Sequence, residues 1–345
     1  MKLKFKHLLL AFLMVPFTVQ AAQYSKTVRQ GYAKSLVTAL NITNKFGTIE
    51  INDRGGDSVT VSATIRVESI SEGKASQLMD LIRIDIRRNG GLLEVKTIIS
   101  DNFKTKENFS IDYAINIPKD RNLTVDNKFG NVVVKELEAK GQFAVGYGNL
   151  SAGVLNAPSG SDISLDLSYG KADIEYVTQL SGDIKYSKLF IGGANRMKLI
   201  SKYSGLNIDE IKELQLDSKY DGVSISEITS LSALSKYTNY KIEELKKELK
   251  INTEYGSIRV NEVSADFSRI EISNSYGGIV IGLNQASYQL DAQCDYCDVN
   301  YPTDRFRGDR IKNNTKLEIR GAVGEQTGNK NVIIKSRYGN IKLNN

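Results

Sequence analysis

The 345-residue sequence contains no tryptophan, one histidine, two cysteines and four prolines. The histidine, His7, lies in the amino-terminal segment that we expect to be removed. His-based triads, His metal ligands and His general bases are therefore excluded from the mature chain. The absence of tryptophan also weakens the case for a sugar cleft built on ring stacking. We predict no catalytic residues, no metal site and no cofactor.

The two cysteines, Cys294 and Cys297, stand in the sequence Cys-Asp-Tyr-Cys. In an oxidising compartment they could close a small disulfide loop. The same spacing occurs in redox motifs, but a redox centre needs a helix amino terminus, and these residues fall at a strand corner. Zinc binding is disfavoured because two further cysteine or histidine ligands are absent. A possible disulfide, or a free pair, is the preferred interpretation.

Residues 1–21 have the organisation of a secretory signal peptide. Lys2, Lys4 and Lys6 precede an apolar stretch from Leu8 to Val19, and Val19-Gln20-Ala21 forms a small-residue cleavage site. An uncleaved anchor is disfavoured because Pro16 interrupts the stretch, which is shorter than the roughly 20 residues of a spanning helix. We expect secretion across the inner membrane, no transmembrane segment in the mature chain, and a location in the periplasm or at the cell envelope or surface.

Positive charge is modest once this segment is removed. The chain has 46 basic and 40 acidic residues, and the first 21 residues hold three of the basic ones and none of the acidic ones, which leaves a net charge of +3. A nucleic-acid-binding protein usually has a concentrated basic face. The charge balance therefore predicts no nucleic-acid partner.

The dominant feature is a repeat in which an aromatic residue recurs at near-constant spacing. From Tyr169 to Tyr276 the intervals are 17, 17, 17, 17, 18 and 21 residues. Such a period is typical of a solenoid, whose units are too short to bury their own apolar faces and must stack. The predicted ladder consists of Phe129, Tyr147, Tyr169, Tyr186, Tyr203, Tyr220, Tyr237, Tyr255, Tyr276, Tyr296 and Tyr338.

Each unit resembles two short strands joined at a corner. Around Tyr220, residues of the core face alternate before the ring and resume three and five places after it, at Leu214, Leu216, Ser218, Val223 and Ile225. We expect the rings to point inward as a buried stabilising column. We also expect the corner to follow the ring, where Asp221-Gly222, or a glycine such as Gly148, tolerates a positive backbone angle.

The predicted fold is all-β, a single elongated parallel β-solenoid with about 17–22 residues per rung. Residues 22–128 are less regular, with strands, one helix near 72–81 and a hairpin turn at 89–91, and should cover the open amino-terminal end. The solenoid repeats occupy 129–345, with a loop or hairpin inserted at 302–329.

Four lysines directly precede ladder residues on consecutive units: Lys185, Lys202, Lys219 and Lys236. As neighbours of inward residues they should point outward and form a basic column, a candidate site for an anionic glycan. The alternative is a solvated edge that prevents aggregation. Recurring carboxylates, such as Asp166 and Asp183, are interpreted as surface residues because the sequence gives them no common cleft.

Several of the repeat phrases are Asn44-Lys45-Phe46-Gly47, Asn127-Lys128-Phe129-Gly130, Ser201-Lys202-Tyr203-Ser204 and Ser218-Lys219-Tyr220-Asp221. Behind a signal peptide, they resemble an uncharacterised bacterial family known as "putative adhesin" or auto-transporter adhesin head domain. The resemblance spans nearly the whole mature chain. It implies a β-solenoid of the cell envelope and transfers no catalytic positions.

The sequence therefore predicts a non-enzymatic, adhesin-like solenoid that presents a repetitive surface to a glycan, an envelope component or a protein partner. Two alternatives stay open. One is a polysaccharide-active enzyme of the parallel β-helix type, which would need a cleft lined by converging carboxylates. The other is a structural or envelope-stress accessory protein without a ligand.

Overall fold

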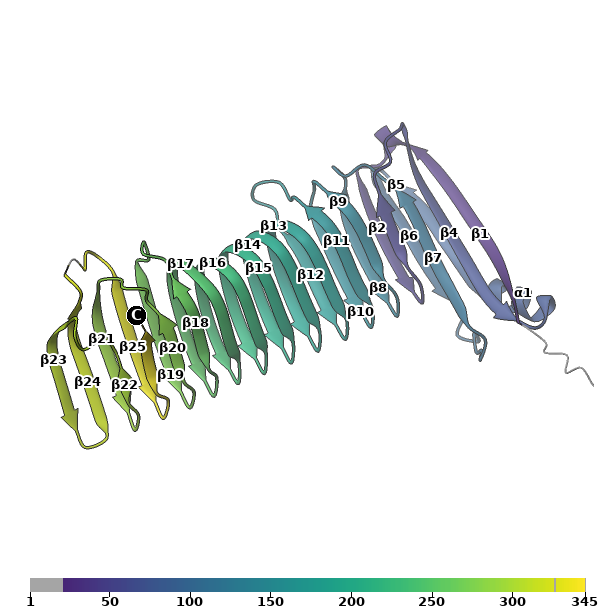
Figure 1. The fold of residues 1–345 in the computed structure, drawn as a ribbon. Coiled ribbons are helices and arrows are strands. Elements are labelled where there is room, and N and C mark those ends of the chain that lie inside the picture. The colour runs from purple at the N-terminus through teal and green to yellow at the C-terminus, as the bar shows by residue number, and fades with distance from the viewer. Residues whose placement is uncertain (1–20, 326, 345) are drawn as a thin grey trace, which may run out of the picture.

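The structure, a computed structural model, describes residues 21–325 and 327–344 and is a single long β-solenoid (Figure 1). The predicted all-β, parallel fold is confirmed. The signal peptide expected at 1–21 lies outside the described residues, apart from Ala21. No helix among the described residues is long and apolar enough to cross a membrane.

The rungs are held together by parallel pairing of equivalent residues. In the central rungs each residue pairs with the one 17 places on, for example Leu199 with Leu216. The inward residues of every rung are mostly leucine, isoleucine and valine, and they form one continuous buried core. The central elements are β8 (Asn122–Lys128), β9 (Val132–Leu137), β10 (Gly141–Gly146), β11 (Asn149–Leu155), β12 (Ile163–Ser168), β13 (Lys171–Lys185), β14 (Lys188–Lys202), β15 (Gly205–Lys219), β16 (Gly222–Lys236), β17 (Asn239–Glu254), β18 (Ile258–Val263), β19 (Arg269–Ser275) and β20 (Ile279–Gly282).

At the amino-terminal end each sheet face of the solenoid gains one more parallel strand, β7 on one face and β6 on the other, and then continues into antiparallel strands. On one face β3 pairs with β7, β7 with β4 and β4 with β1, and on the other β2 pairs with β6 and β6 with β5. These strands cover the first rung. The elements are β1 (Ala22–Ala33), η1 (Lys34–Leu36), β2 (Ala39–Lys45), β3 (Ile49–Asn52), β4 (Ser58–Ser69), α1 (Glu72–Asp80), β5 (Ile82–Asn89), β6 (Leu92–Ile99) and β7 (Phe109–Asn116).

At the other end the rungs do not follow the order of the sequence. The last strands slot between two earlier rungs, because β25 pairs with both β19 and β21, and β26 pairs with both β20 and β22. Figure 1 accordingly places the carboxyl terminus inside the stack, beside β20, β21 and β25. The β23–β24 hairpin pairs with β21. The elements are β21 (Tyr288–Asp295), β22 (Val299–Asn300), β23 (Phe306–Asn313), β24 (Lys316–Val323), β25 (Asn331–Arg337) and β26 (Ile341–Asn344).

The repeated aromatics form a continuous stack of twelve rings from Phe46 to Tyr296, with Tyr338 inserted as the eleventh. Neighbouring ring centroids lie 4.7–5.1 Å apart and the planes are within 16° of parallel. The prediction that these rings point into the core is wrong. From Phe129 onward each ring residue is 41–54% exposed, so the stack runs along an outer edge of the solenoid.

The reason is the backbone conformation of the ring residue itself. All twelve adopt the left-handed region, with φ between 51° and 64°. This conformation breaks the alternation of side chains at the ring, one residue earlier than expected, and turns the aromatic outward. Ser218, two residues before Tyr220, is still buried, whereas Tyr220 is half exposed.

The glycines that follow many of the rings therefore serve a different purpose from the one predicted. Gly148 does not have a positive φ. A Cβ atom at this position would lie 1.9 Å from the carbonyl oxygen of Gly130 on the neighbouring rung. The same clash would arise at Gly130, Gly170, Gly256, Gly277 and Gly339. Glycine is needed here because the backbones of adjacent rungs approach closely.

We expect Gly148→Ala to destabilise the protein by about 1–3 kcal/mol, because the added methyl group must displace backbone. The matched control is Gly222→Ala, whose Cβ would meet nothing within 4 Å and which has no positive φ. Urea unfolding of the two variants tests the difference. Equal midpoints would contradict the close-approach explanation.

Because the rings are half exposed, the removal of one should lower the free energy of unfolding less than the removal of a core side chain. Tyr220→Ala loses ring pairing and part of its buried area, and we expect a loss of about 1–2 kcal/mol. Leu216→Ala, in the core of the same rung and 4% exposed, should lose about 2–5 kcal/mol. Chemical denaturation of both variants compares them, and a larger loss for Tyr220→Ala would show that the ladder is the main stabilising column after all.

Candidate functional site

The four lysines predicted as a basic column stand on four successive rungs. Lys185 pairs with Lys202, Lys202 with Lys219, and Lys219 with Lys236 in the parallel register. Each directly precedes a ladder tyrosine, so the column follows the outer edge made by Tyr186, Tyr203, Tyr220 and Tyr237. Glu254 occupies the next register position and Ser168 the preceding one, and they bound the column.

The two ends of the column are paired with carboxylates and the middle is not. Lys185 lies 2.6 Å from Asp183, and Lys236 lies 2.9 Å from Glu254. These hydrogen bonds raise the pKa of both lysines. Among the described residues, Lys202 and Lys219 have no ion pair, so their ammonium groups are the ones free to meet an external anion.

A second, shorter row of lysines, which sequence reasoning missed, lies on the other side of the rings. Lys171 and Lys188 each stand two places after a ladder tyrosine and pair with each other between rungs. Lys171 contacts Asp173 at 2.9 Å and lies over the ring of Phe190. The next two positions in the register are Gly205 and Gly222, so no side chain stands at this position beside Tyr203 and Tyr220. The sequence could have revealed this row, because both lysines stand two places after a ladder tyrosine.

The stacking determines what the tyrosines can contact. Each interior ring has a neighbour on both faces, at 4.7–5.0 Å between centroids around Tyr186 to Tyr237. Neither face is therefore available to stack on a sugar or a base. Only the ring rims and hydroxyl groups are exposed to a ligand.

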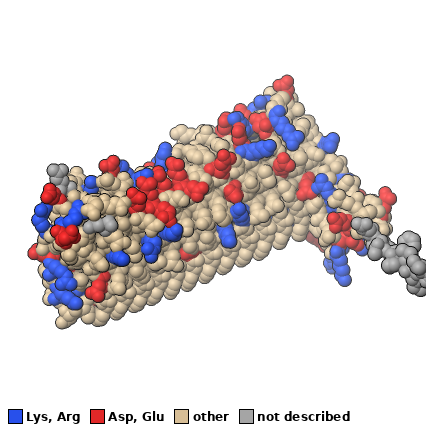
Figure 2. Space-filling view, in the orientation of Figure 1, with Lys and Arg blue, Asp and Glu red and all other residues tan. Residues whose placement is uncertain are grey.

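The opposite bend of the same rungs is acidic. Glu210, Glu227, Glu244 and Glu262 follow one another in register from β15 to β18. Lys246 contacts two of them, at 3.2 Å from Glu227 and 2.6 Å from Glu244. Figure 2 shows Asp and Glu gathered over this stretch of the visible face. The central rungs therefore have lysines at one corner and glutamates at the other.

Three of the carboxylates that a polysaccharide-active enzyme could use, Asp183, Glu213 and Glu271, contact basic side chains. Asp166 pairs in register with Asp183, which contacts Lys185. A groove of about 450 Å³ across β15–β19 is lined by Glu213, Glu248 and Glu271 among others. A glycosidase needs one carboxylic acid with a raised pKa. Here Arg196, at 2.8 Å, lowers the pKa of Glu213, and Arg269 contacts Glu271 at 2.9 Å.

Within the described residues no three His, Cys, Asp or Glu side chains are grouped so that they could hold a metal ion.

Beneath the lysine column lies a buried polar row that sequence reasoning also missed. Ser187, Ser204, Asp221 and Thr238 take the place of glycine after four consecutive rings and are at most 8% exposed. Each of the first three accepts a hydrogen bond from a backbone N–H one rung earlier, as when Ser204 N donates to Asp221 Oδ1 at 2.7 Å. Burial raises the pKa of Asp221. The signal was the change from glycine to Ser, Asp or Thr.

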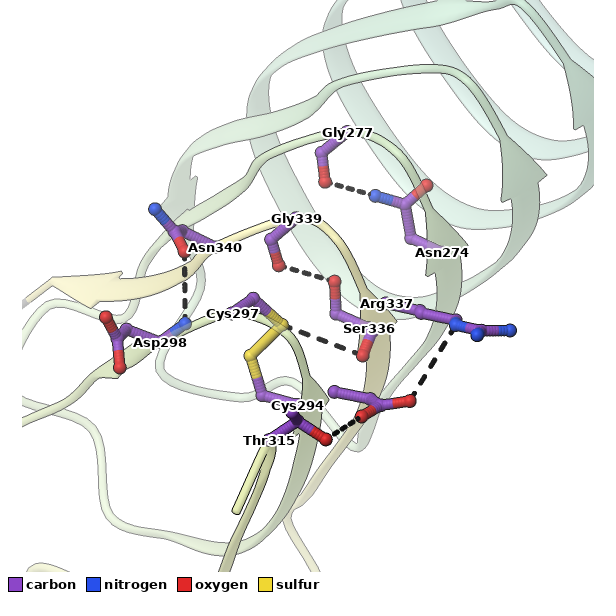
Figure 3. Close-up of a disulfide and its surroundings, with 11 residues drawn as sticks. Asn274, Gly277, Cys294, Cys297, Asp298, Thr315, Ser336, Arg337, Gly339 and Asn340 are labelled. Atoms are coloured by element: carbon purple, nitrogen blue, oxygen red, sulfur yellow. Dashed lines mark hydrogen bonds and ion pairs between the residues drawn. A yellow bond between two sulfur atoms is a disulfide. The ribbon is translucent and has the colours of Figure 1, made fainter. Parts of the chain in front are cut away.

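Cys294 and Cys297 form a disulfide across the corner of the last rung. Figure 3 shows that it occupies the position of a hydrogen bond in neighbouring rungs, where the residue two before the ring is tied to the residue after it. Asn274 Nδ2 donates to the Gly277 carbonyl, and Ser336 Oγ to that of Gly339 at 2.5 Å. Cys294 is 2% exposed. The geometry is that of a covalent corner link buried in the stack.

These features define a class of protein: a capped parallel β-solenoid with an external aromatic stack. The chain belongs to the family Toastrack DUF4097, which matches residues 37–344. This confirms the family relationship expected from the repeat phrases. No curated protein sequence matches the chain.

Solved structures that resemble the chain have low sequence identity. A "putative adhesin" from Bacteroides fragilis is 15% identical, with 72% of this chain and 97% of that chain covered and a TM-score of 0.34. A "putative adhesin" from Parabacteroides merdae is 11% identical, with 74% and 95% covered and a TM-score of 0.33. A "Putative lipid binding protein" from Parabacteroides distasonis is 12% identical, with 73% and 95% covered and a TM-score of 0.36.

The buried carboxylate makes a testable prediction about pH. Because the pKa of Asp221 is higher in the folded than in the unfolded chain, the folded state binds more protons between the two values, and stability falls as pH rises through this window. Asparagine can still accept the hydrogen bond from Ser204 N through its Oδ1, and its Nδ2 can donate to the Ser218 hydroxyl, which donates to the Asp221 carboxylate in the parent. Asp221→Asn should therefore be more stable than the parent at pH 7, and this advantage should shrink toward pH 4.

Urea unfolding at several pH values measures this effect. The matched control is Asp217→Asn, an exposed carboxylate on the same rung, which should show no such pH-dependent gain. An Asp221→Asn variant that is less stable than the parent at neutral pH would mean that the ionised carboxylate is a net stabilising group.

Proposed function

We propose that this protein is a non-enzymatic component of the bacterial cell envelope that uses the lysine column along its ladder edge to bind an anionic envelope partner. The observation that supports this most directly is the register of Lys185, Lys202, Lys219 and Lys236 on consecutive rungs. A row of like charges at rung spacing is electrostatically unfavourable by itself. An anion lying over the row relieves that repulsion.

The surroundings of the column support the same function. The mature charge expected from the sequence is only +3, yet the central rungs separate lysines and glutamates onto opposite corners. Electrostatic complementarity of this kind directs an anionic partner to one edge and disfavours the other. Asp183, Glu213 and Glu271 each contact a basic side chain, which favours binding over hydrolysis.

The cellular location is part of the proposal. The amino-terminal segment has the pattern of a secretory signal, and the Cys294–Cys297 disulfide is typical of an oxidising compartment. Both support a periplasmic or surface location. Fractionation of cells, with the protein recovered in the periplasm or outer envelope, is the expected result.

Retention on an immobilised acidic polysaccharide tests the binding function. We expect the mature protein to be retained at low salt and released as salt is raised, because the attraction is between exposed charges. Replacement of all four column lysines by serine should abolish retention. The control replaces four exposed lysines scattered over other positions, Lys198, Lys212, Lys250 and Lys312, and removes the same net charge.

If the control loses retention as fully as the column variant, net charge alone explains the binding and the column has no special role. No retention of the parent at low salt would refute the proposed function. Circular dichroism of each variant verifies the fold.

A further inference from the structure

We propose that the partner is a linear acidic polysaccharide with one carboxylate per sugar residue, and that it lies lengthwise on the ladder edge with successive carboxylates on successive rungs. This inference rests on the proposed function and specifies its ligand. It is drawn from the width of the column, the closed ring faces, the rung spacing and the free tyrosine hydroxyls.

The lysine column is one residue wide. It therefore matches a linear anionic polymer better than a flat anionic surface. Two residues before the lysines, the outward positions of the same rungs are Asp183, Ile200, Asp217 and Leu234. A flat anionic membrane pressed on this edge would meet Asp183 and Asp217 together with the lysines. A single polymer chain can follow the row of lysines, where the carboxylates of the described residues that contact the column are Asp183 and Glu254, one at each end.

The ring stack disfavours a nucleic acid as that polymer. Proteins hold single-stranded nucleic acids largely by stacking bases on aromatic faces. Between Tyr169 and Tyr255 every ring face is covered by the next ring at 4.7–5.0 Å. No ring face on this edge is therefore free to stack on a base, whereas a sugar chain can contact the ring rims and the hydroxyl groups.

The spacing fits one charge per sugar residue. The Tyr203 and Tyr220 ring centroids, which report the distance between adjacent rungs, lie 4.8 Å apart. A sugar residue in an extended chain is about as long as one rung. Successive sugars of a polyuronate are rotated about the chain axis, and lysine side chains are long and flexible enough to reach carboxylates on either side of it. Consecutive carboxylates can then meet consecutive lysines, with Lys202 and Lys219, which have no ion pair among the described residues, as the central pair.

The tyrosine hydroxyls supply the polar contacts that sugars need. Among the described residues, no protein hydrogen bond engages the hydroxyls of Tyr186, Tyr203, Tyr220 and Tyr237, and these side chains are 43–49% exposed. A hydroxyl group both donates and accepts. Each rung therefore offers one ammonium and one free hydroxyl side by side, which matches the carboxylate and hydroxyl groups of a uronic acid.

Binding of galacturonate oligomers of defined length to the mature protein tests the lengthwise arrangement. By calorimetry at low salt, the tetramer should bind about five- to tenfold more tightly than the dimer, because two more exposed ion pairs form. Octamers should gain little over tetramers, because Ser168 and Glu254 bound the column. Equal affinities of dimer and tetramer would overturn the lengthwise arrangement.

Three double variants test where the oligosaccharide binds. Lys202→Ser with Lys219→Ser should remove the advantage of the tetramer, whereas Lys198→Ser with Lys250→Ser, off the column, should preserve it. Tyr203→Phe with Tyr220→Phe keeps the rings and removes two hydroxyls, and should weaken the tetramer about two- to fivefold. An unchanged tetramer affinity in the Lys202 and Lys219 variant would place the ligand elsewhere and overturn the inference.

Vesicles containing phosphatidylglycerol provide the comparison with a membrane surface. If the protein binds vesicles through the column lysines but shows no length-dependent binding of galacturonates, the proposed anionic function holds and the polysaccharide inference fails. If neither the acidic resin, the oligomers nor the vesicles bind, both fail. Length-dependent binding of oligomers with little vesicle binding is the expected result.

Discussion

The structure depends on one constraint, the in-register parallel pairing of equivalent residues on successive rungs. It requires each rung to turn at the same point, and the ring residue provides that turn by adopting a left-handed backbone conformation. A non-glycine residue is strained there. Ring stacking and the dense hydrogen bonding between rungs offset this cost, so the aromatic repeat and the left-handed corner support each other. The lysine column and the glutamate row exist as columns only because the register repeats them.

The position directly after each ring can hold different residues without disturbing the register of the rungs. Where glycine follows the ring, adjacent backbones approach too closely for a side chain. Where Ser187, Ser204 or Asp221 follows it, the side chain accepts the hydrogen bond of a backbone N–H one rung earlier. In the last rung a disulfide links the corner. The residues that stabilise the corner therefore differ from rung to rung, whereas the outward orientation of the rings is the same in each.

The sequence predicted the solenoid, its period, the covering strands at its amino-terminal end and eleven of the twelve residues of the aromatic stack, all but Phe46. The alternating apolar positions and the 17-residue spacing made this possible, because both are direct consequences of the rung. The sequence did not predict that the rings face outward, since the conformation of Tyr220 depends on both its neighbours in the stack. It also missed Lys171 and Lys188, and the buried row at Asp221. Their positions relative to the ring were readable, but their burial or exposure depends on where the corner falls.

The placement of β25 and β26 between earlier rungs has a consequence for how the protein matures. A solenoid whose rungs follow the order of the chain can grow by addition of one rung after another as the polypeptide is synthesised. In this protein the final fourteen described residues fill a gap left in the interior of the stack. The stack therefore cannot be completed until these residues are available, and a chain that lacks them would leave four strands, β19, β20, β21 and β22, each with an unpaired edge.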